Sequence, residues 1–300
     1  MPLMVPSSSR REFLLGAATS VAGILSLSQN AFASTNSDPD FIALLSDTHI
    51  AADPTTVNLK TNMADNLGAV RNQLLNLPLL PGSTVVTGDC AYLTGEAADY
   101  ATLAGLTDPL SKAGHSLHYL LGNHDNLTRF RSGIKSAQKS EPIESKHVTR
   151  IETRKANLIL LDSLDKTNST PGVLGVQQLK WIETALDMDK NKPAIVMVHH
   201  NPVLSGDASG ALTDTRALFD LLAPKRQVKM VIFGHTHHWE TKTYEGIHLI
   251  NLPPVAYPFN DTDPCGWVAM HLAKTGVDLT LHALKGHKND GQKLNLNWRV

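Results

Sequence analysis

Five short polar clusters, each directly after an apolar run that predicts a buried strand, constrain this chain more than any other feature of its sequence. The clusters are Asp47-Thr48-His49, Gly88-Asp89, Gly122-Asn123-His124-Asp125, His199-His200-Asn201-Pro202 and Gly234-His235-Thr236-His237. The carboxyl ends of strands line the ligand crevice in open α/β sheets, so we expect these five loops to converge. The pattern therefore predicts an α/β fold that gathers Asp, Asn and His side chains at one edge.

Between the clusters, short β-rich runs alternate with amphipathic helical patterns. Strands are predicted at 41–45, 83–87, 117–121, 147–152, 156–161, 194–198 and 230–233. Helices are predicted at 57–77, 96–113, 176–186 and 213–224. From Trp239 onward the pattern is typical of strands alone, with hairpin turns at Glu245-Gly246 and 274–276. We therefore expect a single domain over 34–300, with two packed sheets and helices outside.

The spacing inside the clusters indicates how ligands are presented. Asp47 and His49 stand two residues apart, and so do His235 and His237. In extended backbone this spacing points both side chains to the same side, as chelation of one ion requires. Glycine precedes the polar residues in three clusters, at Gly88, Gly122 and Gly234. Its missing Cβ is expected to let the backbone turn sharply as it leaves the sheet.

The donor set of Asp, Asn and His offers oxygen and imidazole nitrogen but no thiolate. This set suits Zn, Mn, Fe or Co better than copper(I) or a calcium cage. The chain contains 14 histidines, and histidine is the commonest metal ligand. The carboxylate, amide and imidazole groups exceed what one tetrahedral ion needs and fit two ions that share a carboxylate. We therefore predict a binuclear centre of divalent or mixed-valence transition metal ions.

The series D-x-H, G-D, G-N-H-D, H-H-x-P and G-H-x-H, in this order along the chain, resembles the calcineurin-like metallophosphoesterase superfamily. It is most similar to the bacterial branch of cyclic-nucleotide and glycerophosphodiester phosphodiesterases. The resemblance implies a four-layer αββα sandwich of two mixed sheets with flanking helices. It implies that one ion is held by Asp47, His49 and His237. It implies that the other ion is held by Asn123, His199 and His235, with Asp89 bridging the two.

The same resemblance implies a mechanism. His124 contacts the substrate and protonates the leaving group, Asp125 orients His124, and His200 and Asn201 are candidate substrate contacts. Two cations lower the pKa of a bridging water, so that a hydroxide attacks phosphorus in line at neutral pH. We predict hydrolysis of phosphodiesters of the cyclic-nucleotide or glycerophosphodiester type. The alternatives are an exported phosphomonoesterase that scavenges phosphate and a non-catalytic metal-binding module.

Other conspicuous residues receive ordinary interpretations. Seven histidines outside the clusters are expected to be polar residues without a metal role: His115, His118, His147, His248, His271, His282 and His287. Cys90 and Cys265 could pair in an exported protein, but two unpaired thiols are favoured. Tyr92 completes a G-D-x-x-Y pattern of purple acid phosphatases, whose tyrosinate binds ferric iron. Because His49 can fill that coordination position, we expect Tyr92 to pack.

The beginning of the chain has the pattern of an export signal. Arg10 and Arg11 precede a weakly apolar stretch that runs to about Leu27, and Ala31-Phe32-Ala33 forms an A-x-A cleavage site. The stretch is too short and too rich in small residues to span a bilayer. We predict a twin-arginine signal at 1–33, export by the twin-arginine machinery to the periplasm or exterior, and no stable membrane anchor after cleavage. A Sec signal or an uncleaved anchor are the alternatives.

The charge balance limits the class of partner. Lys and Arg number 27 and Asp and Glu 28, a formal net charge of −1. Such a chain offers no basic groove to follow a polynucleotide, so no nucleic acid is expected as partner. The charged fraction of 18% is too low for a disordered chain, and the hydrophobic fraction of 42% is enough for a sizeable core. The expected partner is a small phosphoester substrate.

Overall fold

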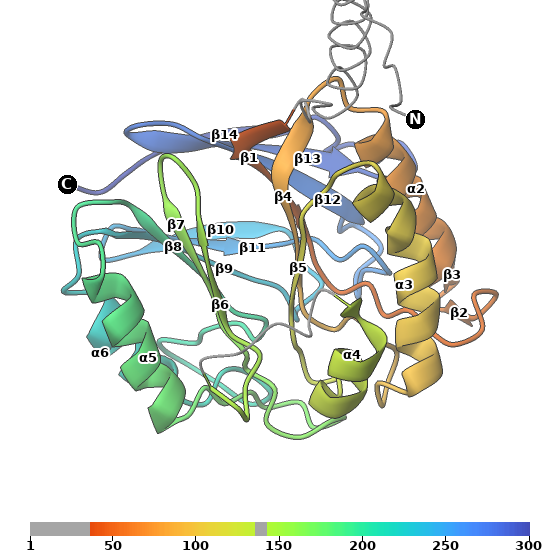
Figure 1. Ribbon diagram of the computed structural model, residues 1–300, viewed down its shortest axis with the longest axis horizontal. Helices are drawn as coiled ribbons and strands as arrows, with labels where there is room; N and C mark the ends of the chain where they lie inside the picture. The colour runs from red at the N-terminus through yellow and green to blue at the C-terminus, as the bar shows by residue number, and fades with distance from the viewer. Residues whose placement is uncertain (1–36, 136–142) are drawn as a thin grey trace, which may run out of the picture. The chain divides into compact units, whose positions relative to one another are not determined.

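Two mixed sheets of six strands each carry the fold (Figure 1). The computed structural model describes residues 37–135 and 143–300, and the predicted export signal at 1–33 lies outside them. The first sheet is built, in spatial order, from β14 (Lys293–Asn297), β13 (Gly276–Ala283), β12 (Gly266–Leu272), β1 (Ser37–Leu45), β4 (Leu80–Thr87) and β5 (Leu117–Leu120). The second is built from β10 (Glu240–Tyr244), β11 (Ile247–Asn251), β9 (Val228–Phe233), β8 (Ala194–Met197), β7 (Asn157–Leu160) and β6 (Thr149–Glu152).

Apolar side chains of the two sheets pack against each other to form the central core. Leu44 and Val268 of the first sheet and Ile195 and Ile250 of the second are all fully buried there. Leu44 and Ile195 come from continuous apolar runs that predicted buried strands, because a strand covered on both faces has no polar side.

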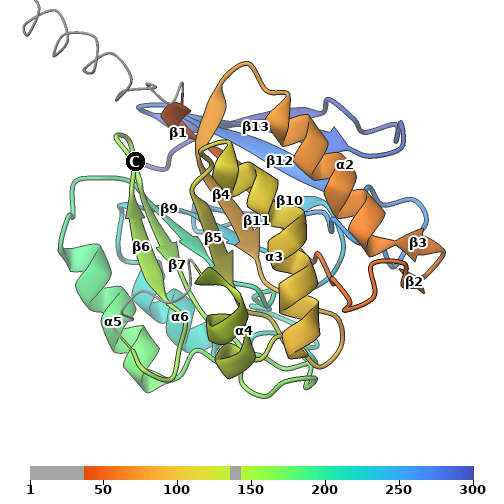
Figure 2. The ribbon, with the colours of Figure 1, turned by 45° about the vertical axis from the view of Figure 1, so that its right-hand side comes forward.

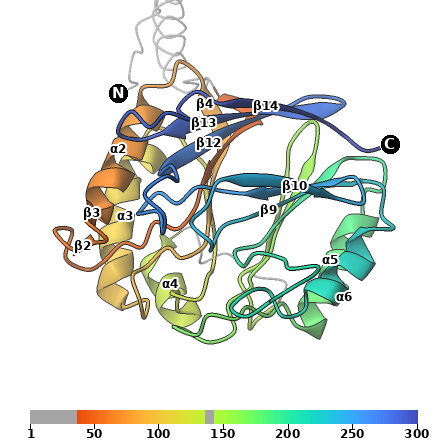
Figure 3. The same cartoon turned by 180° about the vertical axis from the view of Figure 1, so that it is seen from behind.

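Helices cover the outer face of each sheet (Figures 2 and 3). The first sheet packs on α2 (Met63–Leu75) and α3 (Ala97–Lys112), and the second on α5 (Val176–Asp187) and α6 (Thr215–Leu222). The expected four-layer αββα sandwich is therefore confirmed. Within the part of the chain that the structure describes, every helix is too short or too polar to cross a membrane.

Two local features differ from the sequence-based expectations. The helix expected at 57–77 begins only at Met63, after a hairpin of β2 (Val57–Asn58) and β3 (Thr61–Asn62). Asn62 caps α2 by accepting a hydrogen bond of 2.9 Å from the Asp65 N–H, which defines this start. A short helix, α4 (Leu127–Gly133), was not expected, and it follows the third polar cluster directly.

The strand directions place the five polar clusters. In the first sheet β1 pairs in parallel with β4, and β4 with β5. In the second sheet β7, β8 and β9 are also parallel. The carboxyl ends of β1, β4, β5, β8 and β9 each lead into one cluster. The fold therefore delivers all five clusters to one edge of the sandwich.

Candidate metal centre

The five loops converge on one cluster of potential metal ligands. Within each of three groups, the nearest ligand atoms all lie within 4.8 Å of one another. The groups are Asp47, His49 and His237; Asp89, His199 and His235; and His49, Asp89 and His124. Since His49 and Asp89 each belong to two groups, the groups join into one continuous cluster.

The cluster contains buried ligand atoms that no protein group satisfies. Asp47 Oδ1 and His199 Nε2 have no hydrogen-bond partner, and neither has Oδ1 of Asn123, the residue before His124. In addition, the Nε2 atoms of His49 and His237 lie only 3.0 Å apart. An unsatisfied buried polar atom costs about 1–3 kcal/mol. Cations placed among these atoms supply the missing partner for all of them, so the residues present fit a metal centre.

Burial and mutual attraction set the charges of the cluster. Burial raises the pKa of the Asp89 carboxyl, but His199 and His49 outweigh it and hold that pKa well below its usual range. Burial lowers the pKa of His199, but the carboxylates of Asp89 and Asp47 outweigh it and raise that pKa to about 9. Burial lowers the pKa of His49 to about 3. Burial also raises the pKa of Asp47, but the histidines outweigh it and lower that pKa, as they do that of Asp89. Both aspartates are therefore ionised at neutral pH, which favours a cation between them.

Backbone carbonyls fix which ring nitrogen of the histidines carries the proton. Nδ1 of His199 lies 2.9 Å from the Thr87 carbonyl oxygen. Nδ1 of His237 lies 2.5 Å from the Tyr257 carbonyl oxygen. A carbonyl only accepts, so both Nδ1 atoms donate. Nε2 is therefore the nitrogen of each ring that can give up its proton and offer a lone pair to an ion. His235 is held in the opposite sense: its Nε2 lies 2.9 Å from a carbonyl oxygen, which leaves Nδ1 free.

The backbone at the paired ligands is not extended, contrary to the expectation from their spacing. The φ angles are 51° at Asp47, 45° at His49, 70° at His235 and 52° at His237, all in the left-handed region that non-glycine residues rarely adopt. His235 and His237 accordingly lie in different ligand groups rather than chelating one ion. Backbone strain of this kind gathers at functional sites, where the surrounding structure holds it in place.

The glycines before the clusters act mainly by leaving space. Gly88 has a φ of +102° and turns the chain as expected. A Cβ on Gly122 would lie 2.3 Å from Asp89 Oδ1, and one on Gly234 would lie 2.5 Å from Asp47 Oδ2. At Gly122 and Gly234 φ lies outside the left-handed region, and the missing side chain makes room for a carboxylate.

His124 lies at the edge of the cluster with one ring nitrogen already engaged. The backbone N–H of His124 donates to Asp89 Oδ1 at 2.8 Å, and its ring Nδ1 lies 2.8 Å from the Leu93 carbonyl oxygen. The resemblance implied that Asp125 orients this ring, but Asp125 does not hold it. Its carboxylate accepts hydrogen bonds from other groups: the N–H of Cys90, Ala91 and Gly122, and the hydroxyl of Tyr100. Asp125 therefore joins the loops after β4 and β5, and Leu93 orients His124.

The sequence pattern of the family described as calcineurin-like phosphoesterase matches residues 42–239. The chain belongs to the calcineurin-like phosphoesterase family. Phosphoesterases of this family use a binuclear metal centre, and the chain is accordingly a metal-dependent phosphoric ester hydrolase.

Relatives of this phosphoesterase include bacterial enzymes named for cyclic nucleotides. A cAMP/cGMP dual specificity phosphodiesterase of Mycobacterium tuberculosis is 30% identical over 219 residues, 70% of this chain and 65% of that protein. The match thus spans just under two thirds of that relative. The 3',5'-cyclic adenosine monophosphate phosphodiesterase CpdA of Vibrio vulnificus is 28% identical over 250 residues, 80% of this chain and 84% of that protein.

Solved structures share the fold at low sequence identity. A dimetal phosphatase from Danio rerio has a TM-score of 0.68 and 16% identity, covering 86% of this chain and 99% of that one. A purple acid phosphatase from yellow lupin has a TM-score of 0.60 and 14% identity, covering 86% of this chain and 53% of that one. These similarities support the αββα fold of the phosphoesterase.

The remaining sequence-based candidates lie beside the centre or away from it. His200 is fully buried, with Nδ1 2.7 Å from Ser163 Oγ, and its Nε2 has no hydrogen-bond partner. Asn201 is half-buried and lines a neighbouring pocket. Cys90 and Cys265 are unpaired, and Tyr92 packs against the core, as expected. The histidines outside the clusters belong to none of the ligand groups found among the described residues.

The sequence did not point to several residues that support the ligands. The Ser46 hydroxyl donates a hydrogen bond to Asp47 Oδ2. Its position directly before Asp47 in the chain was the only sequence feature that could have indicated this contact. The ring of Phe259 stacks on His237 with centroids 4.0 Å apart and an interplanar angle of 5°. This aromatic residue lies in a loop between strands, where the sequence pattern gives no indication of contact with a ligand.

Proposed function

We propose that this phosphoesterase hydrolyses phosphodiesters, with cyclic nucleotides as the substrate class. The names of its relatives from Mycobacterium tuberculosis and Vibrio vulnificus support the cyclic-nucleotide class. The 203–210 loop, which follows the His199-His200 pair, contains no lysine or arginine. A dianionic monoester is usually bound by lysine or arginine side chains that donate to its phosphate oxygens. The absence of both residue types from this loop therefore favours a diester.

The observation that carries the proposal is the cluster of unsatisfied ligand atoms with His124 at its edge. Asp47, His49 and His237 are the proposed ligands of one ion. Asn123, His199 and His235 are those of the other, with Asp89 between the two. When bound, two ions of Zn, Mn, Fe or Co lower the pKa of a water molecule and offset the negative charge of the phosphoryl oxygens.

His124 is the proposed general acid. The Leu93 carbonyl holds Nδ1–H, so Nε2 is the nitrogen that gives its proton to the leaving oxygen. Loss of an alkoxide is the difficult step of diester hydrolysis, and a positioned proton donor contributes about 10²–10⁴-fold to such a step. Asp125 supports this role indirectly, because it fixes the loop that carries His124.

The test is a comparison of two substrates on the metal-loaded enzyme. We expect kcat/KM for 3',5'-cyclic AMP to exceed that for 5'-AMP, a monoester with the same nucleoside, by at least about tenfold, a difference of 1.4 kcal/mol in transition-state binding. A preference for the monoester would identify a phosphomonoesterase that scavenges phosphate. Hydrolysis of neither substrate, with two ions bound, would identify a metal-binding module.

We also propose that residues 1–33 direct export by the twin-arginine route. The paired arginines, the weakly apolar stretch and the A-x-A triplet support this proposal. Export of a reporter fused after residue 33 should be lost when Arg10 and Arg11 are both replaced by lysine, and the exported protein should begin at Ser34. Undiminished export of the double variant would indicate the Sec route, and an intact N-terminus would indicate an uncleaved anchor.

A further inference from the structure

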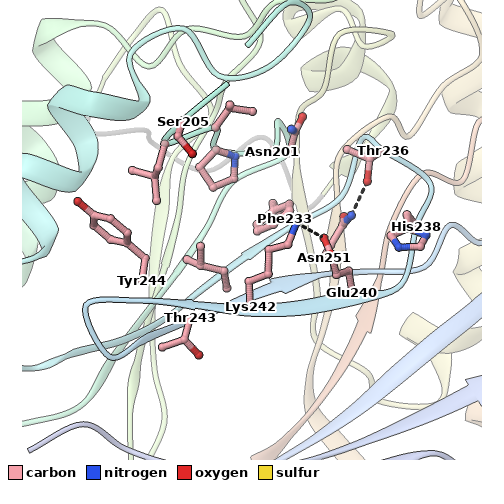
Figure 4. Close-up of a pocket in the computed structure, with 14 residues that line it drawn as sticks. Asn201, Ser205, Phe233, Thr236, His238, Glu240, Lys242, Thr243, Tyr244 and Asn251 are labelled. Carbon is pink, nitrogen blue, oxygen red and sulfur yellow. Dashed lines mark hydrogen bonds and ion pairs between the residues drawn. The ribbon is translucent and has the colours of Figure 1, made fainter. Parts of the chain in front are cut away.

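A pocket of about 510 Å³ lies on the outer face of the second sheet (Figure 4), and its lining residues Thr236 and Asn201 are neighbours in the chain of the metal-centre clusters. Its floor is formed by β9, β11 and β10. The strand register places Phe233, Asn251 and Glu240 in one row across these strands, and Leu249 beside Lys242 in the next. The wall facing this floor is the 201–205 loop, which follows β8. The volume falls in the range of about 300–1,000 Å³ that small-molecule sites occupy.

The pocket changes in character with distance from the metal centre. At the near end, Thr236 stands between the proposed ligands His235 and His237, and Asn201 directly follows the histidine pair after β8. Away from this end the lining includes the apolar or aromatic residues Val203, Leu204, Tyr244 and Leu249. The ion pair of Lys242 with Glu240, 2.8 Å long, also lies in the floor. Figure 4 shows Tyr244 at the opposite side of the pocket from Thr236.

Asn251 carries hydrogen-bonding capacity that the protein does not use. It is 3% exposed, and its amide nitrogen donates to Thr236 Oγ1. Asn251 lines the pocket, and its Oδ1 atom is buried without any hydrogen-bond partner. If the amide were flipped, its NH₂ group would lack a hydrogen-bond partner instead, so one end of the side chain is unsatisfied in either orientation. A buried amide of this kind fits a ligand that supplies the missing partner.

We propose that this pocket binds the nucleoside part of a nucleotide phosphodiester while the phosphate lies at the metal centre. The inference rests on the proposed function and names the part of the substrate that this pocket recognises. The order along the pocket, from metal ligands through Thr236 and Asn251 to Leu249 and Tyr244, matches the order of phosphate, sugar and base. Asn251 then hydrogen-bonds a sugar hydroxyl, and the planar base covers the apolar floor.

Binding of adenosine to the metal-free protein tests the pocket directly, because adenosine has no phosphate and needs no metal. Titration calorimetry in the presence of a chelator should detect adenosine binding that Asn251→Leu and Tyr244→Ala each weaken by at least about tenfold, equivalent to one net hydrogen bond or ring contact. Thr241→Ala is the matched control. Thr241 lies on the same strand, β10, but alternates to the opposite face from Glu240 and Lys242.

A kinetic comparison distinguishes the pocket from the proposed function. On the metal-loaded enzyme, Asn251→Leu should raise KM for 3',5'-cyclic AMP about tenfold with kcat nearly unchanged. KM for glycerophosphocholine, a diester without a nucleoside, should stay the same. Val203→Trp, which fills the pocket from its loop wall, is expected to give the same split and replaces Asn251→Leu if that variant does not fold.

The outcomes separate the two proposals. Adenosine binding that depends on Asn251, with no diester hydrolysed, would support the pocket and refute the phosphodiesterase. Adenosine binding that is absent, or is equal in the native protein and in the Asn251→Leu, Tyr244→Ala and Val203→Trp variants, would overturn the nucleoside subsite. An equal rise in KM for both diesters would also overturn it, because the pocket would then not discriminate the nucleoside.

Discussion

Two aspartates near opposite ends of one strand show what distinguishes the metal centre from ordinary buried charge. Asp40 lies near the start of β1 and Asp47 lies two residues past its end, and both are fully buried. Arg154 Nε lies 2.9 Å from Asp40 Oδ2, and Lys155 Nζ lies 3.5 Å from the same oxygen. Asp47 Oδ1 has no hydrogen-bond partner, and the nearest basic nitrogen is His237 Nε2 at 3.4 Å.

The difference between these two sites lies in where the cations come from. At Asp40 the chain supplies permanent cations, so the carboxylate joins the two sheets through the turn between β6 and β7. At Asp47 the chain supplies only imidazoles, which can lose their proton and bind a metal ion in its place. Left-handed φ angles also gather at the Asp47 end, at Asp47, His49 and Asp89. The carboxylate near one end of the strand forms salt bridges within the chain, and the carboxylate past the other end is a ligand of the metal centre.

The largest effect is expected from Asp89→Asn, which removes the proposed shared ligand. We expect kcat/KM to fall on the order of 10³-fold, because metal ions supply several kcal/mol of transition-state stabilisation. Asp40→Asn, at the opposite end of the strand, should leave kcat/KM within about twofold, because a site far from the metal centre that shares no contacts with it is not coupled to it. Steady-state kinetics at saturating metal measure both. Full activity of Asp89→Asn would show that this carboxylate does not bridge.

His124→Asn should show a loss that depends on the leaving group. With cyclic AMP, whose leaving oxygen is an alkoxide, we expect kcat to fall about 10²-fold or more. With bis(p-nitrophenyl) phosphate the leaving group needs no proton, so the loss should be at least tenfold smaller. Kinetics on both substrates check this. An equal loss on the two would assign His124 to binding rather than to proton transfer.

The free energy of unfolding should separate the two aspartates in metal-free protein. Asp40→Asn should lower it by about 1 kcal/mol, because the ion pairs with Arg154 and Lys155 are lost and Arg154 is largely exposed. Asp47→Asn should be neutral or stabilising in the presence of a chelator, since it removes a buried charge that lacks a permanent cation. Urea unfolding of both variants measures the difference. A loss at Asp47 as large as that at Asp40 would make Asp47 a structural carboxylate.

A smaller effect is expected from acid. Burial raises the pKa of Asp40, but Arg154 and Lys155 outweigh it and lower that pKa below its ordinary value. A carboxyl with a lowered folded-state pKa stabilises the fold above its unfolded pKa and loses that contribution as the pH falls through the folded value. Below about pH 4 the native protein should therefore lose its advantage over Asp40→Asn, an advantage of about 1 kcal/mol because Arg154 is largely exposed. A gap that persists to pH 2 would contradict the ionic role of Asp40.

The sequence pattern predicts two packed sheets with helices outside and the convergence of the polar clusters at strand ends, and the family resemblance implies the αββα sandwich and the ligand set. An apolar run predicts a buried strand regardless of which other strand pairs with it, and each polar cluster directly follows one of these runs. The α2 start was missed because the 57–62 segment forms a hairpin that its sequence pattern does not reveal. The contacts of His124 with Leu93 and of Asp40 with Arg154 were missed for another reason. A backbone carbonyl carries no sequence signal, and partners 114 residues apart are joined only by the fold.

The number of metal ions bound per chain tests the central claim most directly. Protein dialysed against Mn²⁺ or Zn²⁺ and analysed by inductively coupled plasma mass spectrometry should hold two ions per chain, and so should Asp40→Asn. Asp89→Asn, which lacks the shared carboxylate, should hold one ion or none. A native protein that binds at most one ion at saturation, or an Asp89→Asn variant that still binds two, would contradict the binuclear centre.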